Sequence, residues 1–231
     1  MSLRPMKIHL LALLAISISA VPETTQTKRP DTMTKIVVRL MGPGVKAGSS
    51  AALPKTIYRA GEHYARIEDP PDAKQKMEKL TIIDEPDAYS INLIDRKGTH
   101  AADQGGPNDL HLPIVLPFDP THTLGKLDRI EFGAEFEFFK QAGARKLAGP
   151  MINAKPTDIY ELKTPQGSAL LTLRGGTEIP VYFSWRTSDG AYKYEYIAYQ
   201  EIPFEASLFT KPSGIQLREI PPDPDVSGGD R

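Results

Sequence analysis

The chain has 231 residues, of which 40% are hydrophobic and 25% charged, with 28 Lys and Arg against 29 Asp and Glu. These fractions exclude a collagen-like chain, a highly charged disordered chain and a multi-span membrane protein. A net charge of −1 argues against a nucleic-acid-binding protein, because affinity for phosphate depends on clustered Lys and Arg. With no cysteine, the chain forms no disulfide and has no thiolate metal ligand or thiol nucleophile.

The first 20 residues have the pattern of a cleaved export signal. Arg4 and Lys7 precede an apolar run over residues 8–18, and small residues follow at Ser19 and Ala20. The run is shorter than the roughly 20 apolar residues of a transmembrane helix; an uncleaved anchor or a buried helix is the alternative. We therefore expect residues 1–20 to be a signal peptide and the mature chain to be periplasmic or secreted, with no transmembrane span.

The rest of the chain is expected to form one domain. Residues 21–33 are rich in Pro, Thr and charge and predict a flexible lead-in, and residues 221–231 predict a disordered tail. Residues 34–220 contain no linker-like stretch and no repeat, so we expect a single β-rich domain there.

Short β-branched and apolar runs, separated by turn residues, dominate this domain. Alternation of apolar and polar residues and short connections predict antiparallel hairpins. The expected strands are residues 34–41, 56–59, 62–68, 80–84, 89–95, 158–163, 168–174, 180–186 and 191–202. The fold class is therefore mainly β (α+β), with neighbouring strands paired in an antiparallel meander.

Residues 125–143 fit two patterns. In a helix, Phe132, Phe136 and Phe139 share a stripe, while Glu131 and Glu135 face water. In a strand, aromatic residues alternate with glutamates, and Phe138 takes the inward place of Phe139. The length of the segment and Gly143 at its end favour a helix over roughly 127–142, packed on the concave face of the sheet.

The sequence contains no catalytic motif of any specificity. A Gly-x-Ser-x-Gly turn and a phosphate-binding loop are both missing. His63, His100, His111 and His122 match no established metal-ligand spacing. We therefore expect neither an enzyme nor a metal or cofactor; a hydrolase whose residues are scattered along the chain is the least favoured alternative.

The aromatic residues have two interpretations. In the first they form the core between sheet and helix. In the second some of them line an apolar cavity, closed by a long apolar loop over residues 104–124 that contains four prolines. In that case the expected ligand-binding residues are Phe132, Phe136, Phe139, Trp185 and Tyr194.

The layout also resembles that of the outer-membrane lipoprotein-sorting family of periplasmic lipoprotein carriers. The resemblance covers roughly residues 34–219, and the phrases that contribute are residues 61–68, 133–139, 180–186, 203–209 and 212–215. It implies a single curved antiparallel meander of about ten strands, which forms an unclosed half-barrel wrapped over a helix. It also implies a closing strand after residue 215 and a cavity that accepts acyl chains. The chain departs from this family in lacking a long amphipathic helix before the first strand.

These observations predict a non-enzymatic periplasmic protein that binds a lipidic or apolar ligand in a half-barrel cavity. The alternative is an envelope protein-interaction or sensor module that docks a partner through a sheet edge or an apolar face. A filled interior without ligand would favour the alternative.

Overall fold

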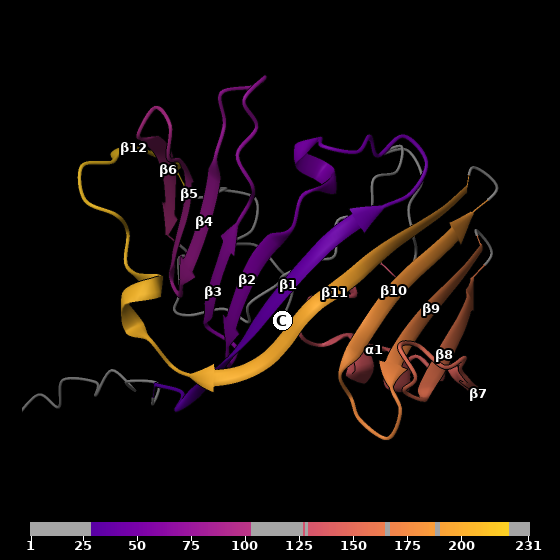
Figure 1. Ribbon diagram of the computed structural model, residues 1–231. Helices are drawn as coiled ribbons and strands as arrows, with labels where there is room; N and C mark the ends of the chain where they lie inside the picture. The colour runs from indigo at the N-terminus through magenta and orange to yellow at the C-terminus, as the bar shows by residue number, and fades with distance from the viewer. Residues whose placement is uncertain (1–28, 103–126, 128, 165–166, 188–189, 222–231) are drawn as a thin grey trace, which may run out of the picture.

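The computed structural model describes residues 29–102, 127, 129–164, 167–187 and 190–221. In this part of the chain, strands from both halves form one open sheet of 12 strands (Figure 1). In chain order they are β1 Thr32–Met41, β2 Lys55–Ala60, β3 Tyr64–Glu68, β4 Lys79–Asp84, β5 Asp87–Asn92, β6 Lys97–Ala102, β7 Arg145–Ala148, β8 Thr157–Thr164, β9 Gly167–Arg174, β10 Pro180–Thr187, β11 Gly190–Pro203 and β12 Gln216–Glu219. The helical elements are η1 Ser50–Ala52, α1 Glu135–Gln141 and η3 Ala206–Phe209.

The sheet consists of two antiparallel meanders joined in the middle. The order is β12-β6-β5-β4-β3-β2-β1-β11-β10-β9-β8-β7, so β1 and β11 form the seam between the halves. Their register runs from Thr32 opposite Pro203 to Met41 opposite Lys193. The predicted meander is therefore confirmed within each half, whereas the seam pairs the first strand with the eleventh.

The strand count is 12, not about ten, because β6 and β7 were absent from the prediction. Their sequences, KGTHAA and RKLA, lack both apolar alternation and β-branched runs. Both are strands through backbone pairing with a neighbour rather than through their own propensity. β1 begins at Thr32, inside the range 21–33 predicted to be a flexible lead-in, so the last two residues of that range belong to the sheet, and Met33 is buried.

The two faces of the sheet carry separate hydrophobic cores. Ile36 lies opposite Ile57 on one face, while the neighbouring pair, Lys35 and Tyr58, lies on the other. We call the face of Ile36 the inner face; its core includes Val38, Ala65, Leu171, Phe183 and Trp185. The opposite, outer face has a core formed by Met33, Ala60, Leu80, Ile82, Ile91 and Phe209.

Leu127 and residues 129–141 cover the inner core, as the helix interpretation predicts. Phe139 on α1 is fully buried, whereas Phe138 is only partly buried, which is the order expected for a helix and not for a strand. The helix is shorter than 127–142, because Gly133 has a φ of +86° and interrupts helical geometry before Glu135. Gly143, at a φ of +73°, follows its C-terminus as predicted.

The C-terminal segment covers the outer core. After β11 the rings of Phe204 and Phe209 stack at 5.3 Å and both meet Tyr64 edge-on. The Arg66 guanidinium donates a hydrogen bond of 2.8 Å to the Leu208 carbonyl in η3. The chain then reaches the far edge of the sheet, where the predicted closing strand is confirmed as β12 (Figure 1). β12 pairs parallel to β6, not antiparallel, because the segment that precedes it crosses the outer face of the sheet instead of turning back in a hairpin.

Candidate functional site

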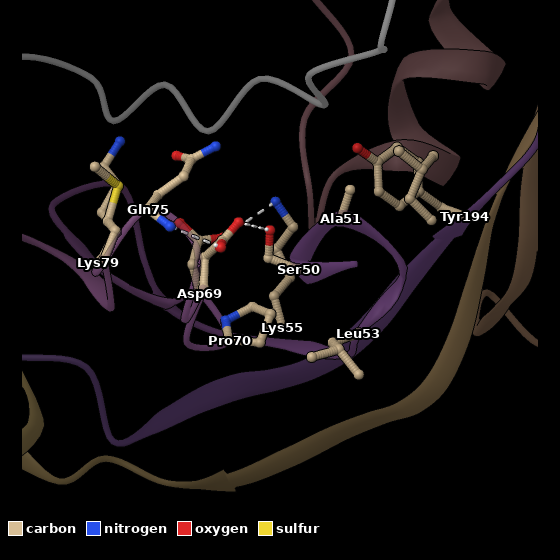
Figure 2. A pocket seen from close by; sticks show the side chains of 12 residues that line it. Ser50, Ala51, Leu53, Lys55, Asp69, Pro70, Gln75, Lys79 and Tyr194 are labelled. Carbon is tan, nitrogen blue, oxygen red and sulfur yellow. Dashed lines mark hydrogen bonds and ion pairs between the residues drawn. The ribbon is translucent and has the colours of Figure 1, made fainter. Parts of the chain in front are cut away.

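A pocket of about 310 Å³ lies between the loops that follow β1 and β3 (Figure 2). Its walls come from η1, from the connection between β3 and β4, and from two inner-face residues, Leu40 on β1 and Tyr194 on β11. We call it the inner pocket. Its lining residues are Leu40, Ser50, Ala51, Leu53, Lys55, Asp69, Pro70, Asp72, Gln75, Met77, Lys79 and Tyr194.

Asp72 holds the two loops of the inner pocket together. One of its carboxylate oxygens accepts the Ser50 hydroxyl at 2.7 Å, and the other accepts the backbone N–H groups of Lys74 and Gln75. The hydrogen bond from Ser50, followed by that from Gln75, lowers the pKa of the Asp72 carboxyl. Asp72 is therefore a structural anion that accepts three hydrogen bonds from the loops that it holds.

The base of the inner pocket is apolar and its rim is charged. Tyr194 is 3% exposed, and its ring meets Phe132 edge-on at 5.4 Å. Burial, assisted by the negative charge of Asp69, raises the pKa of the Tyr194 hydroxyl to about 12, so this residue stays neutral. At the rim, Lys55 Nζ lies 3.5 Å from the Asp69 carboxylate. An apolar base with a charged rim suits an amphiphilic molecule rather than an ion.

The predicted site residues occupy different parts of the inner face. Tyr194 lines the inner pocket and contacts Phe132, which is 4% exposed. Phe139 and Trp185 are fully buried in the inner core; Trp185 also borders a pocket of about 370 Å³ near the β10–β11 turn. Phe136 is partly buried with its ring edge-on to Tyr160. All five therefore belong to the inner core or pack against it, and Tyr194 and Phe132 are in ring contact. Contact of any of them with a ligand stays a prediction.

The sequence analysis did not identify the loop residues of the inner pocket. Ser50 and Leu53 lie in a stretch of small residues, and Asp69 and Asp72 flank a Pro-Pro pair, so both segments resemble ordinary connections. The position of Asp72, two residues before Lys74, could have predicted the turn in the connection between β3 and β4, because Asp side chains accept hydrogen bonds from the backbone at this spacing. The proline loop expected to close a cavity, over 104–124, lies outside the described residues.

A buried carboxyl group lies beneath the start of α1. Glu135 is 1% exposed, so the prediction that it faces water is wrong. Its Oε1 accepts the Tyr196 hydroxyl at 2.7 Å and the Gly133 N–H at 2.9 Å. Glu131, also predicted to face water, is mostly buried and pairs with Arg59 at 2.9 Å. Because residues 131–133 form a turn and not a helix, both glutamates point into the fold.

Stability should depend on pH through Glu135. Burial raises the pKa of this carboxyl, against smaller lowering effects of Tyr196, Gly133 and Arg59. Above about pH 4.3 the unfolded chain has released this proton while the folded chain retains it, so the free energy of unfolding falls as pH rises through that window. Glu135→Gln should remove the part of this fall that comes from Glu135 and leave the part that comes from other groups whose pKa is raised on folding. Urea titrations at about pH 5 and about pH 8 measure it, with Glu137→Gln on the exposed side of α1 as control. An equal fall in wild type and in Glu135→Gln would contradict the assignment.

Two further observations concern the described residues alone. They contain no group of three or more His, Asp or Glu side chains arranged to hold a metal ion. None of the helices among them has the length and apolar character that crossing a membrane requires.

No protein-family model matches the chain, and no curated protein matches it. Among solved structures, an uncharacterized conserved protein from Thermus thermophilus has a TM-score of 0.48 at 8% identity, over 82% of this chain and 91% of that one. The Pseudomonas aeruginosa MucA/MucB complex has a TM-score of 0.41 at 10% identity, over 78% of this chain and 56% of that one. A putative outer membrane lipoprotein-sorting protein domain from Vibrio parahaemolyticus has a TM-score of 0.33 at 6% identity, over 78% and 89%. These similarities are too distant to assign a family, so the function is argued from the site itself.

Proposed function

We propose that this chain is a non-enzymatic binding protein that takes a lipidic or otherwise apolar ligand in the inner pocket. The observation that carries the proposal is the composition of that pocket, in which the buried Leu40 and Tyr194 form an apolar base and Leu53 and Met77 lie beside charged side chains at the rim. Its volume of about 310 Å³ falls at the lower end of the range for small-molecule sites. The ligand is therefore a small amphiphile, or the end of a longer apolar chain.

The state of the polar groups supports binding rather than catalysis. Tyr194 is held neutral, Asp72 accepts three hydrogen bonds from its own loops, and Lys55 pairs with Asp69. Neither the Tyr194 hydroxyl nor the Asp72 carboxylate is poised to take or give a proton near neutral pH. The export pattern of residues 1–20 supports an envelope location for this activity.

A substitution at the rim tests the proposal. Leu53 is 38% exposed, so Leu53→Glu should leave the fold intact while placing a charge against the apolar base. We expect it to weaken binding of palmitate, measured by isothermal titration calorimetry, by about tenfold or more, which corresponds to roughly 1.4 kcal/mol. Ile197→Glu is the matched control, because Ile197 is an exposed apolar residue on β11 that does not line this pocket. Native mass spectrometry of the purified protein should also show a bound lipid.

Two outcomes would overturn this function. One is the absence of both palmitate binding and any co-purified apolar molecule. The other is an equal loss of binding in Leu53→Glu and Ile197→Glu, because the effect would then be unrelated to the pocket.

The second candidate is an envelope interaction module that adds a partner strand to a sheet edge. The observation in its favour is the position of β7, Arg145–Ala148, at one end of the strand order within the described part of the sheet. An edge strand offers backbone N–H and C=O groups to a further strand. If calorimetry detected no palmitate binding and native mass spectrometry detected no bound lipid, this candidate would be favoured.

A further inference from the structure

His100 lies between two carboxylates that come from different strands. Its Nε2 is 2.7 Å from Oδ1 of Asp87 on β5, and its Nδ1 is 2.6 Å from Oε2 of Glu219 on β12. The imidazole stacks on the Tyr89 ring with centroids 4.7 Å apart. The ring is thus fixed in the position that joins β12 to the rest of the sheet.

This arrangement requires a particular protonation state. A neutral imidazole has one N–H, whereas both neighbours of His100 are carboxylates, which only accept hydrogen bonds when ionised. The Glu219 side chain is 72% exposed and that of Asp87 is 42% exposed, so both are in contact with water. Two hydrogen bonds from the ring to two carboxylates form together only when His100 is an imidazolium.

The surroundings favour that charged form. The hydrogen bond to Asp87 has the largest effect and raises the pKa of His100; burial opposes it, and the hydrogen bond and charge of Glu219 raise the pKa further. The other titratable groups nearby are Asp84, whose own pKa is raised mainly by burial and then by Asp87, and Tyr89, whose raised pKa keeps it neutral. The positive charge of Arg29 lowers the pKa of Asp84 against these effects.

The contact between His100 and Glu219 holds the end of the C-terminal segment. Glu219 lies opposite His100 in the parallel register of β12 and β6. Backbone bonds flank the pair, from Gln216 N–H to the Arg96 carbonyl and from Ile220 N–H to the His100 carbonyl. β12 covers the edge of β6, and the segment before it covers the outer core.

We propose that His100 is a proton-controlled clasp: its imidazolium holds β12 on the edge of β6, and loss of the proton loosens β12 and uncovers that edge. Because the pKa of His100 is raised on folding, the clasp is complete below about pH 6.5 and is lost as pH rises through the higher folded value. The uncovered backbone of β6 can then accept a further strand. This device lies on the outer face and is independent of the inner pocket.

Amide hydrogen exchange tests the clasp. After correction for the intrinsic effect of pH, exchange over residues 216–220 in the full chain should be about threefold faster at about pH 8 than at about pH 6, beyond any change in β9, which follows the global stability of the sheet. Glu219→Gln should abolish this difference, since its amide can accept a hydrogen bond from the imidazolium or donate one to neutral imidazole. Because Glu219 is largely exposed, this variant should fold even where His100→Gln does not.

The control is Glu205→Gln, which removes a carboxylate from the same segment outside the clasp and should preserve the pH difference. The proposal is overturned if wild type shows no pH difference over residues 216–220. It is equally overturned if Glu219→Gln keeps the full difference, since the titrating group would then act through another contact.

Discussion

Phe139→Lys is expected to prevent the chain from folding. The Phe139 side chain is fully buried between α1 and the sheet, with its ring 6.2 Å from that of Phe183. Loss of a buried phenylalanine costs about 3–5 kcal/mol, and an unpaired ammonium in its place adds several kcal/mol more. The sum is comparable to the whole stability of a typical domain, about 5–15 kcal/mol. Far-UV circular dichroism and urea titration of the purified variant measure the loss.

Phe138→Lys is the matched control for this substitution. Phe138 immediately precedes Phe139 on the same helix, but it is only partly buried and borders a surface pocket beside Ala134 and Gln141. A lysine there can extend its ammonium into water, so the cost should stay below about 2 kcal/mol. Equal tolerance of lysine at both positions would contradict the packing of α1 on the inner face.

Trp185→Ala should lower the free energy of unfolding by about 3–5 kcal/mol. The prediction that Trp185 is at least half buried is confirmed, since it is 0% exposed within the inner core. Tyr182→Ala on the same strand is the control, because Tyr182 lies on the outer face and its ring contacts Lys193 at 4.1 Å. We expect Tyr182→Ala to lower the free energy of unfolding by about 1 kcal/mol. A loss below about 1 kcal/mol for Trp185→Ala in urea titration would show that its ring contributes little to the core.

The parts of the fold that were predictable are those encoded within short segments. Alternation fixes which residues of a hairpin share a face, and Ile57 and Ile67 do lie opposite each other in the predicted β2–β3 hairpin. For α1, the spacing of the phenylalanines and Gly143 sufficed to favour a helix. Its length was overestimated because Gly133 had no evident role until its positive φ was known.

The features that escaped prediction depend on partners that are distant in the sequence. β7 is a strand because β8 pairs with it, and its RKLA sequence does not by itself predict a strand. Glu135 is buried because Tyr196, 61 residues away, donates a hydrogen bond to it. The inner pocket likewise combines side chains from β1, η1, the β3–β4 connection and β11, and only Tyr194 among them was identified in advance.

The seam between β1 and β11 has a consequence for the nascent chain. Arg39 and Glu195, which face each other across it, are 156 residues apart. At a synthesis rate of roughly 5–20 residues per second, about 8–30 s separate the production of the two strands. β2 follows quickly and pairs with one side of β1, but the other side, next to the consecutive valines Val37 and Val38, has no partner during that interval. A bare edge on a β-branched strand is a template for association with other chains, so the hazard of aggregation for this protein is concentrated in the interval before its eleventh strand is made.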